Sequence, residues 1–171
     1  MLSKSNQFIQ LRKEKLAKIK ALGIDPYPVK SLRTNYISSL LADKEEWLQK
    51  NEEVTITGRL TAMRRQGKIG FGDLEDSSGK IQLYVAQNTI GEENYELFKL
   101  CDAGDFIQAT GKPFFTQTGE YSLKCSQITL LSKNIRPLPA VKEKIVDGKT
   151  IRYDEFSDIE LRYRKRYLDL L

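Results

Sequence analysis

The spacing of apolar residues along the chain first follows a helical period and then an alternating one. Residues 5–23 place their apolar side chains within one broad stripe at the ~100° per residue of an α-helix, and Gly23 is a candidate C-cap. The stretch 25–28 (DPYP) ends this pattern, because proline disfavours helical geometry in the residue before it. Residues 36–50 show a second, shorter helical pattern. We therefore predict two helices in this first part of the chain.

Beyond the second helix, apolar and polar residues alternate, which is typical of half-buried β-strands. The segments VTITGRL, KIGFGDLED and KIQLYVA predict three strands, and in the third Ile81, Leu83 and Val85 share one face. Residues 91–101 predict a helix with acids in its first turn, where they favour the helix dipole. The segments DFIQATGKPFF and EYSLKCSQITLL predict two further strands, joined by a turn at 118–119.

The last predicted strand contains a break in its alternation. Leu123 and Cys125 share a face, whereas Ile128 and Leu130 are out of step with them. An extra residue on one strand of an antiparallel pair disrupts the local ladder and redirects the side chains beyond it. We therefore predict a β-bulge near Ser126 that returns all four apolar side chains to the core.

The order of the predicted elements is strand, strand, strand, helix, strand, strand. This order is typical of the OB-fold, a partly open Greek-key barrel, and an open five-stranded sheet covered by a helix is the alternative. We predict a mainly β protein with flanking helices, in which a five-stranded OB-fold barrel follows an N-terminal amphipathic helix. The predicted boundaries are a helical extension over 1–53, the barrel over 54–132, and a linker with the start of a further domain over 133–171.

Composition excludes several kinds of chemistry. The 171 residues include no His and two Cys, which removes most zinc sites, Ser-His-Asp triads and Cys-His pairs, so we predict no catalytic and no metal-binding residues. Cys101 and Cys125 are predicted to be reduced, buried thiols. No apolar run approaches the ~20 residues of a membrane span, and the N-terminus lacks the apolar region of a secretory signal. We therefore expect a cytoplasmic protein with no membrane partner.

Four side chains on the predicted barrel could bind single-stranded nucleic acid, which requires an aromatic plane, hydrogen-bonding groups and cations. Phe71 lies between two glycines that would leave its ring bare, although a core Phe flanked by glycines is an equal alternative. Gln82 points away from the apolar face of its strand, and its amide both donates and accepts. Arg64 ends the first strand, and Glu120, which opens the fifth, can accept a base N–H. Together they predict a pocket for one or a few flipped-out bases.

Basic side chains outside this group are candidates for phosphate contacts. The net charge is +5, and the stretch 54–72 contains four cations and no acid. The candidates are Lys13, Lys18 and Lys20 on the first helix and Arg65 and Lys68 near the first hairpin. The alternative for the helix is a solvated face that only keeps it soluble. Arg12 and Lys15 fall within the apolar stripe and are expected to help pack the helix.

Longer motifs resemble the N-terminal part of a bacterial-type class II lysyl-tRNA synthetase over nearly the whole chain. These motifs are LRKEKLAKIKALGIDPYP, VTITGRLTAMRRQGKIGFGDLEDSSGKIQLYV, RPLP and ELRYRKRYLDLL. The barrel segment is less specific, because aspartyl- and asparaginyl-tRNA synthetases carry similar barrels. The stretches LGIDPYP, RPLP and RYRKRYLDL indicate the lysine family.

The resemblance implies that the barrel binds the anticodon stem-loop of tRNA(Lys). It places the family's stacking Phe at Phe71, its base-recognising Gln at Gln82, its Arg at Arg64 and its Glu at Glu120. These are the same four residues that strand alternation selects.

The resemblance also implies that the full-length parent is a lysine–tRNA ligase, an enzyme that activates lysine with ATP and magnesium, attaches it to tRNA and forms a homodimer. Motifs 2 and 3 of the catalytic domain are absent from this sequence, so we expect the chain alone to be inactive, to need no cofactor and to be a monomer. A helical pattern over 159–171 ends in leucines with no capping residue. Because such an apolar end needs a partner to bury it, we expect a longer enzyme.

Two other functions are consistent with an OB-fold barrel. The first is a free-standing protein that binds single strands without ligase identity. The second is a protein-interaction module in which Phe71 is buried. Binding of an anticodon stem-loop, compared with a scrambled loop, separates these possibilities.

Overall fold

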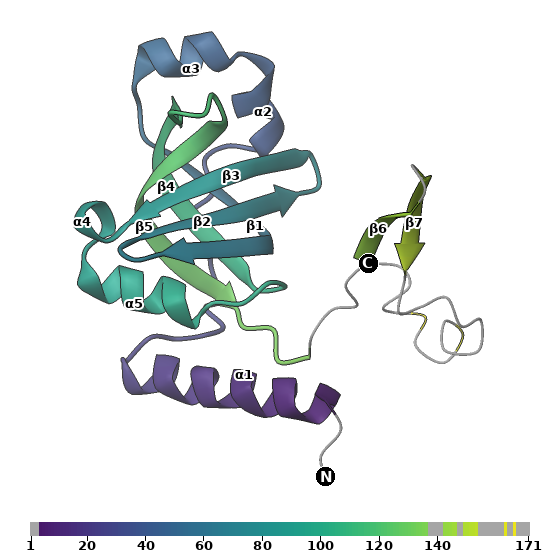
Figure 1. Cartoon of the computed structure of the whole chain (residues 1–171). Coiled ribbons are helices and arrows are strands. Elements are labelled where there is room, and N and C mark those ends of the chain that lie inside the picture. The colour runs from purple at the N-terminus through teal and green to yellow at the C-terminus, as the bar shows by residue number, and fades with distance from the viewer. Residues whose placement is uncertain (1–3, 137–141, 147–148, 154–162, 164–165, 167–171) are drawn as a thin grey trace. The chain divides into compact units, whose positions relative to one another are not determined.

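The computed structural model describes residues 4–136, 142–146, 149–153, 163 and 166. The chain divides into two units, Met1–Arg136 and Pro137–Leu171. The elements of the first unit are α1 (Lys4–Ala21), α2 (Ile37–Ala42), α3 (Lys44–Lys50), β1 (Val54–Gln66), β2 (Ile69–Asp76), β3 (Gly79–Ala86), α4 (Gln87–Ile90), α5 (Glu92–Leu100), β4 (Phe106–Phe115) and β5 (Tyr121–Ser132) (Figure 1).

The five strands of this unit form a closed barrel in the order β1-β2-β3-β5-β4. Four neighbouring pairs are antiparallel, and β3 and β5 close the barrel as a parallel pair in which Gln82 lies opposite Ser122. The predicted five-stranded OB-fold barrel is therefore confirmed, and the open-sheet alternative is wrong. In Figure 1, α1 lies at one end of the barrel and α2 and α3 lie at the other, and α2 and α4 also contact β3.

The predicted bulge in β5 is also confirmed. Thr110 of β4 pairs with Gln127, but the next residue, Gly111, pairs with Cys125, so Ser126 is the extra residue. The Ser126 hydroxyl donates to the carbonyl oxygen of Thr110 at 3.2 Å. Apolar side chains on both sides of the bulge are buried as a result.

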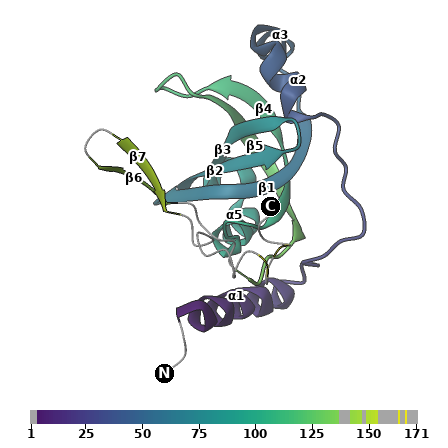
Figure 2. The ribbon, with the colours of Figure 1, turned by 90° about the vertical axis from the view of Figure 1, so that its right-hand side faces the viewer.

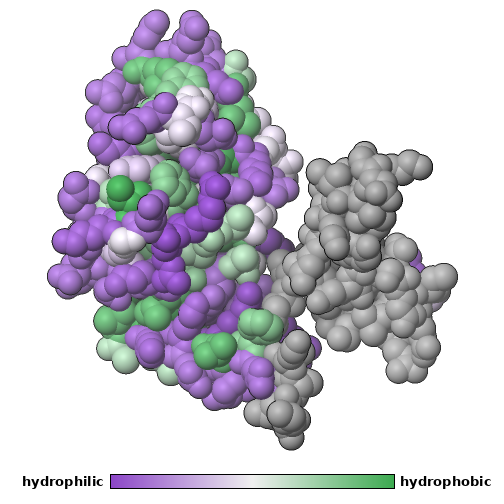
Figure 3. All heavy atoms as spheres, viewed as in Figure 1, coloured by the Kyte–Doolittle hydropathy of each residue, from purple (hydrophilic) through white to green (hydrophobic). Residues whose placement is uncertain are grey.

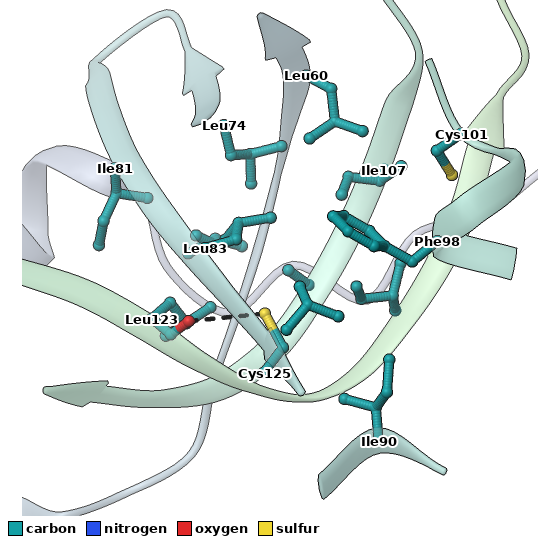
Figure 4. Packing of buried hydrophobic residues seen from close by; sticks show 14 of the residues in the cluster. Leu60, Leu74, Ile81, Leu83, Ile90, Phe98, Cys101, Ile107, Leu123 and Cys125 are labelled. Carbon is teal, nitrogen blue, oxygen red and sulfur yellow. Dashed lines mark hydrogen bonds between the residues drawn. The ribbon is translucent and has the colours of Figure 1, made fainter. Parts of the chain in front are cut away.

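The two glycines beside Phe71 serve the core and do not expose the ring as predicted. A Cβ atom on Gly70 would lie 2.4 Å from Cε1 of Phe98, and one on Gly72 would lie 3.7 Å from Cε2 of the same ring. Phe98 points from α5 into the buried cluster, together with Ile107 and other apolar side chains (Figure 4). Because neighbouring strand residues face opposite sides, Phe71 points outward, and the alternative of a core Phe71 is wrong.

Both cysteines are free and buried, as predicted. Burial raises the pKa of Cys101 to about 12 and that of Cys125 to about 12. The Cys125 thiol donates to the carbonyl oxygen of Leu123 at 3.7 Å within the core (Figure 4). These thiols therefore act as packing groups and not as nucleophiles.

The packing face of α1 is more polar than the predicted apolar stripe. Ile19 is buried, but Phe8, Leu11 and Leu22 are more than half exposed. Figure 3 shows hydrophilic residues over most of the visible face of this unit, with separate hydrophobic areas, some of them over α1. The face that packs therefore combines apolar side chains such as Ile19 with polar ones, and it is narrower than the predicted stripe.

Arg12 and Lys15 help to hold α1 on the barrel, as expected. The Arg12 guanidinium donates to the carbonyl oxygen of Ala103 at 2.9 Å and to that of Asn134 at 3.1 Å. Lys15 forms an ion pair with Asp102. The two side chains fix α1 at one end of the barrel, and α2 and α3 lie at the opposite end in both views (Figures 1 and 2).

A buried ion cluster lies beneath this attachment. The side chain of Lys133 is 0% exposed, and its Nζ donates to Asp102 at 2.6 Å and to Asp105, whose side chain is also 0% exposed, at 2.7 Å. The Asp105 carboxylate accepts two further bonds, from the backbone nitrogens of Asp102 and Asn134, each at 2.8 Å. Burial opposes ionisation of Asp102, but hydrogen bonds from Lys133 and Lys15 outweigh it and hold its pKa below the ordinary value.

The single helix predicted over 36–50 is wrong. The chain breaks at Asp43 into α2 and α3, and the Asp43 carboxylate accepts a bond from the backbone nitrogen of Glu46 at 3.0 Å. Aspartate is a preferred N-cap because it satisfies such an unpaired donor. The short helix α4 was not predicted.

The second unit contains an antiparallel pair, β6 (Lys142–Val146) and β7 (Lys149–Tyr153), within the segment expected to be a linker. The sequence between the strands is Asp-Gly, a strong hairpin signal that our prediction overlooked. The helix predicted over 159–171 lies outside the described residues apart from Tyr163 and Arg166. Across the described part of the chain, no helix has the length and apolar character needed to span a membrane.

Candidate nucleic-acid interface

A hollow of about 880 Å³ crosses the outer face of β2 and β3 and reaches the turn between β4 and β5. Its walls come from the end of the β1–β2 hairpin, from outward residues of β2, β3 and β5, and from the β4–β5 turn. The lining residues are Arg64, Arg65, Gln66, Ile69, Phe71, Gln82, Tyr84, Phe114, Phe115, Thr116, Gln117, Thr118 and Lys124.

Aromatic rings form a row along this hollow. The centroids of Phe71 and Tyr84 lie 5.6 Å apart with a 68° angle between the ring planes, and those of Tyr84 and Phe114 lie 5.4 Å apart at 70°. Phe71 and Tyr84 are directly paired in the β2–β3 ladder, so strand register sets their contact. Such edge contacts hold the rings against the sheet, and Phe71 remains half-buried rather than enclosed.

The larger hollow is electropositive. Arg64, Arg65 and Lys124 line it, and none of its described lining residues is acidic. The Arg64 guanidinium carbon lies 6.0 Å from the centroid of the Phe71 ring, to which it is paired across β1 and β2. Arg65 donates to the carbonyl oxygen of Lys99 at 3.1 Å, which anchors its guanidinium at the C-terminal end of α5. A polyanion entering this hollow would therefore meet three cations together with an aromatic row.

Gln82 lines the hollow from β3, next to the closing strand β5. Its Oε1 accepts a bond from the Ser122 hydroxyl at 3.1 Å across the parallel β3–β5 pair. Within the described part of the chain, its amide nitrogen has no hydrogen-bond partner. The oxygen also retains a second lone pair, so the side chain can both donate to and accept from the edge of a base.

A second hollow of about 580 Å³ adjoins the first and contains Glu120. Arg64, Gln82 and Phe115 line both hollows. The backbone of Glu120 holds the β4–β5 turn, because its nitrogen donates to the Thr116 hydroxyl and its carbonyl oxygen accepts from the Thr116 nitrogen, each at 3.0 Å. The turn predicted at 118–119 is confirmed, and Gly119 has the positive φ of 81° that such a turn favours.

The four predicted base-binding residues lie together on one face of the barrel. Arg64 and Gln82 line both hollows, Phe71 lines the larger one and Glu120 the smaller one. The predicted phosphate-binding residues are more dispersed. Arg65 lines the larger hollow, whereas Lys68 lies exposed in the β1–β2 turn and lines neither. The α1 lysines 13, 18 and 20 are exposed on a helix that contributes to neither hollow.

Sequence reasoning missed several side chains that shape the site. Tyr84 lies two residues after Gln82, and strand alternation places it on the same outward face, but our prediction did not include it in the site. Phe114, Phe115 and Lys124 carry no comparable signal, because they reach the hollow through the β4–β5 turn and the closure of β5 onto β3. Their position depends on the barrel as a whole.

A closed five-stranded barrel that carries aromatic rings and cations across β2 and β3 defines a class of protein, the single-strand-binding OB-folds. Comparison with known proteins agrees, since residues 54–131 match the family of OB-fold nucleic acid binding domains of the tRNA-anticodon type. Residues 54–131 thus form an anticodon-binding OB-fold domain, and the chain matches the N-terminal region of lysine–tRNA ligases.

Three curated relatives illustrate this match, each of them a lysine–tRNA ligase. The protein of Oceanobacillus iheyensis is 42% identical over 176 residues, covering 100% of this chain and 34% of the relative. That of Streptococcus pneumoniae is 43% identical over 166 residues, covering 94% and 31%. That of Bacillus thuringiensis is 40% identical over 171 residues, covering 97% and 32%. The chain spans about a third of the length of the curated relatives it matches.

Proposed function

We propose that this chain selects tRNA(Lys) for a lysine–tRNA ligase by binding its anticodon loop on the β2–β3 face of the barrel. The observation that carries this proposal is the composition of the larger hollow, in which an outward aromatic row is bordered by three cations and by no acid among its described lining residues. Stacking of an unpaired base on such a ring, with cations for its phosphates, is the usual means of single-strand recognition.

Within this proposal each of the four central residues has its own role. Phe71 stacks the central uridine of the anticodon, and Arg64, beside that ring, contributes positive charge to the same nucleotide. Gln82 recognises the edge of the base through its amide. Glu120 accepts a hydrogen bond from a base N–H. Arg65 and Lys68 contact phosphates near the first hairpin, and Lys13, Lys18 and Lys20 contact phosphates along the anticodon stem.

The complete ligase would activate lysine with ATP and magnesium and transfer it to the tRNA 3′ end in the cytoplasm. We assign the sites for lysine, ATP and magnesium, and the homodimer interface, to the part of the ligases that this chain does not span. The described residues of this chain contain no group of three or more potential metal ligands. The chain alone would be an inactive monomer that binds tRNA without a cofactor.

Titration of the chain with a synthetic anticodon stem-loop of tRNA(Lys), alongside a stem-loop of scrambled loop sequence, tests this function. We expect tighter binding of the matched loop, because its unpaired bases are recognised as well as its phosphates. Equal affinity for both would support a nonspecific single-strand binder. No binding to either would support a protein-interaction module.

Replacing Gln82 with alanine is expected to reduce discrimination at the central base more than overall affinity. Hydrogen bonds to base edges specify sequence, whereas contacts to phosphates only position the strand. The measurement is the ratio of dissociation constants for stem-loops with uridine and with cytidine at the central position. Gln127, exposed on β5 outside both hollows, supplies the control variant Gln127→Ala. An unchanged ratio in Gln82→Ala would reject the role of this residue.

Replacing Lys13, Lys18 and Lys20 together with alanine is expected to weaken matched and scrambled stem-loops alike. The slope of log K against log[salt] should flatten by about 0.7–0.9 for each phosphate that the variant no longer neutralises. Arg12 and Lys15 are left in place because they attach α1 to the barrel. Parallel salt dependences for the variant and the wild type would show that these lysines only keep the helix soluble.

A further inference from the structure

The β1–β2 hairpin carries much of the positive charge beside the larger hollow. Arg64 and Arg65 line the hollow from the end of β1, and Lys68 follows in the two-residue turn. All three residues are exposed. Long cationic side chains lose conformational freedom when they bind a phosphate, and this loss reduces affinity unless the protein already restricts the segment that carries them. The way in which the hairpin is held therefore affects binding.

Three hydrogen bonds tie this hairpin to α4 and α5, which lie beside it (Figure 1). The Tyr95 hydroxyl donates to the carbonyl oxygen of Gly67 at 2.9 Å. The backbone nitrogen of Gln87 donates to the carbonyl oxygen of Lys68 at 2.9 Å. The Arg65 guanidinium forms the third bond, at the C-terminal end of α5. Both carbonyl groups of the exposed turn are thus bonded to the helices, whereas most exposed turns leave such groups to water.

Tyr95 reaches this turn from the core. It is 2% exposed and belongs to the buried cluster, where its ring centroid lies 6.4 Å from that of Phe98. A phenylalanine at this position would fill the same space without a polar group that needs a partner, so packing alone does not account for the hydroxyl. The hydroxyl connects the core directly to the turn that lies between Arg65 and Lys68.

These bonds leave the two cations able to bind an anion. The Arg65 guanidinium donates to the Lys99 carbonyl oxygen through one N–H group and retains its other donors. Lys68 is tethered through its backbone carbonyl and remains exposed. The hairpin is therefore fixed at its backbone while its charged groups stay accessible.

We propose that Tyr95 is a positioning residue for RNA binding, whose hydroxyl fixes the turn of the first hairpin so that Arg65 and Lys68 are already in place for the phosphates of the bound strand. Tyr95 lines neither hollow, so it acts through these two cations and not by touching the RNA. This inference rests on the proposed function, because it assumes that RNA occupies the larger hollow.

The test removes the hydroxyl alone. Tyr95→Phe keeps the buried ring and is expected to weaken binding of the matched anticodon stem-loop by roughly 2- to 12-fold, the effect of having to immobilise a flexible side chain on binding. The slope of log K against log[salt] should flatten at the same time, by about 0.7–0.9 if one phosphate contact is lost. Isothermal titration calorimetry at several salt concentrations measures both quantities.

Tyr27→Phe is the matched control, because it deletes a similar hydroxyl bond away from the hairpin. The Tyr27 hydroxyl donates to the carbonyl oxygen of Lys133 at 3.1 Å, and Tyr27 lines neither hollow. Each variant should lower the melting temperature by about 2–8 °C, the effect of one hydrogen bond, but Tyr27→Phe should leave RNA affinity unchanged. Backbone order parameters from NMR relaxation should fall at Gly67 and Lys68 in Tyr95→Phe only.

A double-mutant cycle shows whether the effect passes through the hairpin cations. In a background of Arg65→Ala and Lys68→Ala, the further change Tyr95→Phe should leave affinity unchanged, because the groups that it positions are gone. A loss of the same size in this background would overturn the positioning role. An equal loss of affinity in Tyr27→Phe would do so as well.

The outcomes separate this inference from the function on which it rests. If the wild type selects the matched loop and Tyr95→Phe binds it with unchanged affinity, the positioning role is overturned and the proposed function stands. A wild type that does not distinguish matched from scrambled loops would overturn the proposed function itself.

Discussion

Replacing Lys133 with alanine is expected to lower the free energy of unfolding by about 3–5 kcal/mol, the usual cost of removing one partner of a buried ion pair. The variant would leave Asp105 charged, fully buried and without its only cationic partner among the described residues. Asp102 would retain Lys15 but lose its second cation. Urea-induced unfolding, followed by circular dichroism, measures this change.

The matched control is Lys80→Ala, which removes an ion pair of similar geometry at the surface. Lys80 lies 2.8 Å from Asp73 but is about half exposed, so its loss should change stability by less than about 1 kcal/mol. The double variant Lys133→Ala, Asp105→Ala should lose less than the sum of the single variants, because the two side chains act as one unit. Equal effects of Lys133→Ala and Lys80→Ala would contradict a structural role for the cluster.

The second large effect concerns binding: Phe71→Ala is expected to weaken binding of the anticodon stem-loop by ~1–3 kcal/mol, the usual loss per stacked base. Phe71 points outward from β2, is half-buried against Tyr84 and lies beside the Arg64 guanidinium. Truncation removes the aromatic face while leaving Phe98 and the core beneath β2 in place. Isothermal titration calorimetry of wild type and variant gives the difference directly.

Thermal unfolding of the same variant separates binding from folding. Because Phe71 is not part of the buried cluster, its replacement should change stability much less than a core Phe→Ala replacement, which costs about 3–5 kcal/mol. Phe71→Leu, which keeps apolar volume but no aromatic face, should bind as weakly as Phe71→Ala. A folded variant with wild-type affinity would remove Phe71 from the site.

The packing of the core also holds the Phe71 ring in a fixed position before a base binds. Gly70 allows the Phe98 ring to pack directly beneath β2, because a Cβ atom there would lie 2.4 Å from the ring, and a Cβ atom on Gly72 would lie 3.1 Å from Leu60. The strand that carries Phe71 is thus supported from below by α5 and from its side by Tyr84. Rigid support of this kind reduces the entropy lost when a base binds.

The sequence by itself determined the elements of the barrel and the residues that face outward on it. Strand alternation has a period of two, so the outward position of Gln82 and the bulge at Ser126 follow from local pattern. The resemblance to lysyl-tRNA synthetases led to the same family that the comparisons support. Arg64, Phe71, Gln82 and Glu120 could be named in this way because each lies on or beside a strand of strong alternation.

Only the tertiary structure decided what lies opposite these residues in space. The closure of β3 onto β5 brings Ser122 to Gln82. The path of β4 into the β4–β5 turn places Phe115 where it lines both hollows. Asp105 directly precedes β4, and Lys133, 28 positions later in the chain, directly follows β5. The two side chains meet only because the start of β4 pairs with the end of β5. Local pattern specifies which side of a strand a residue occupies, but distances between strands depend on the closure and twist of the whole barrel.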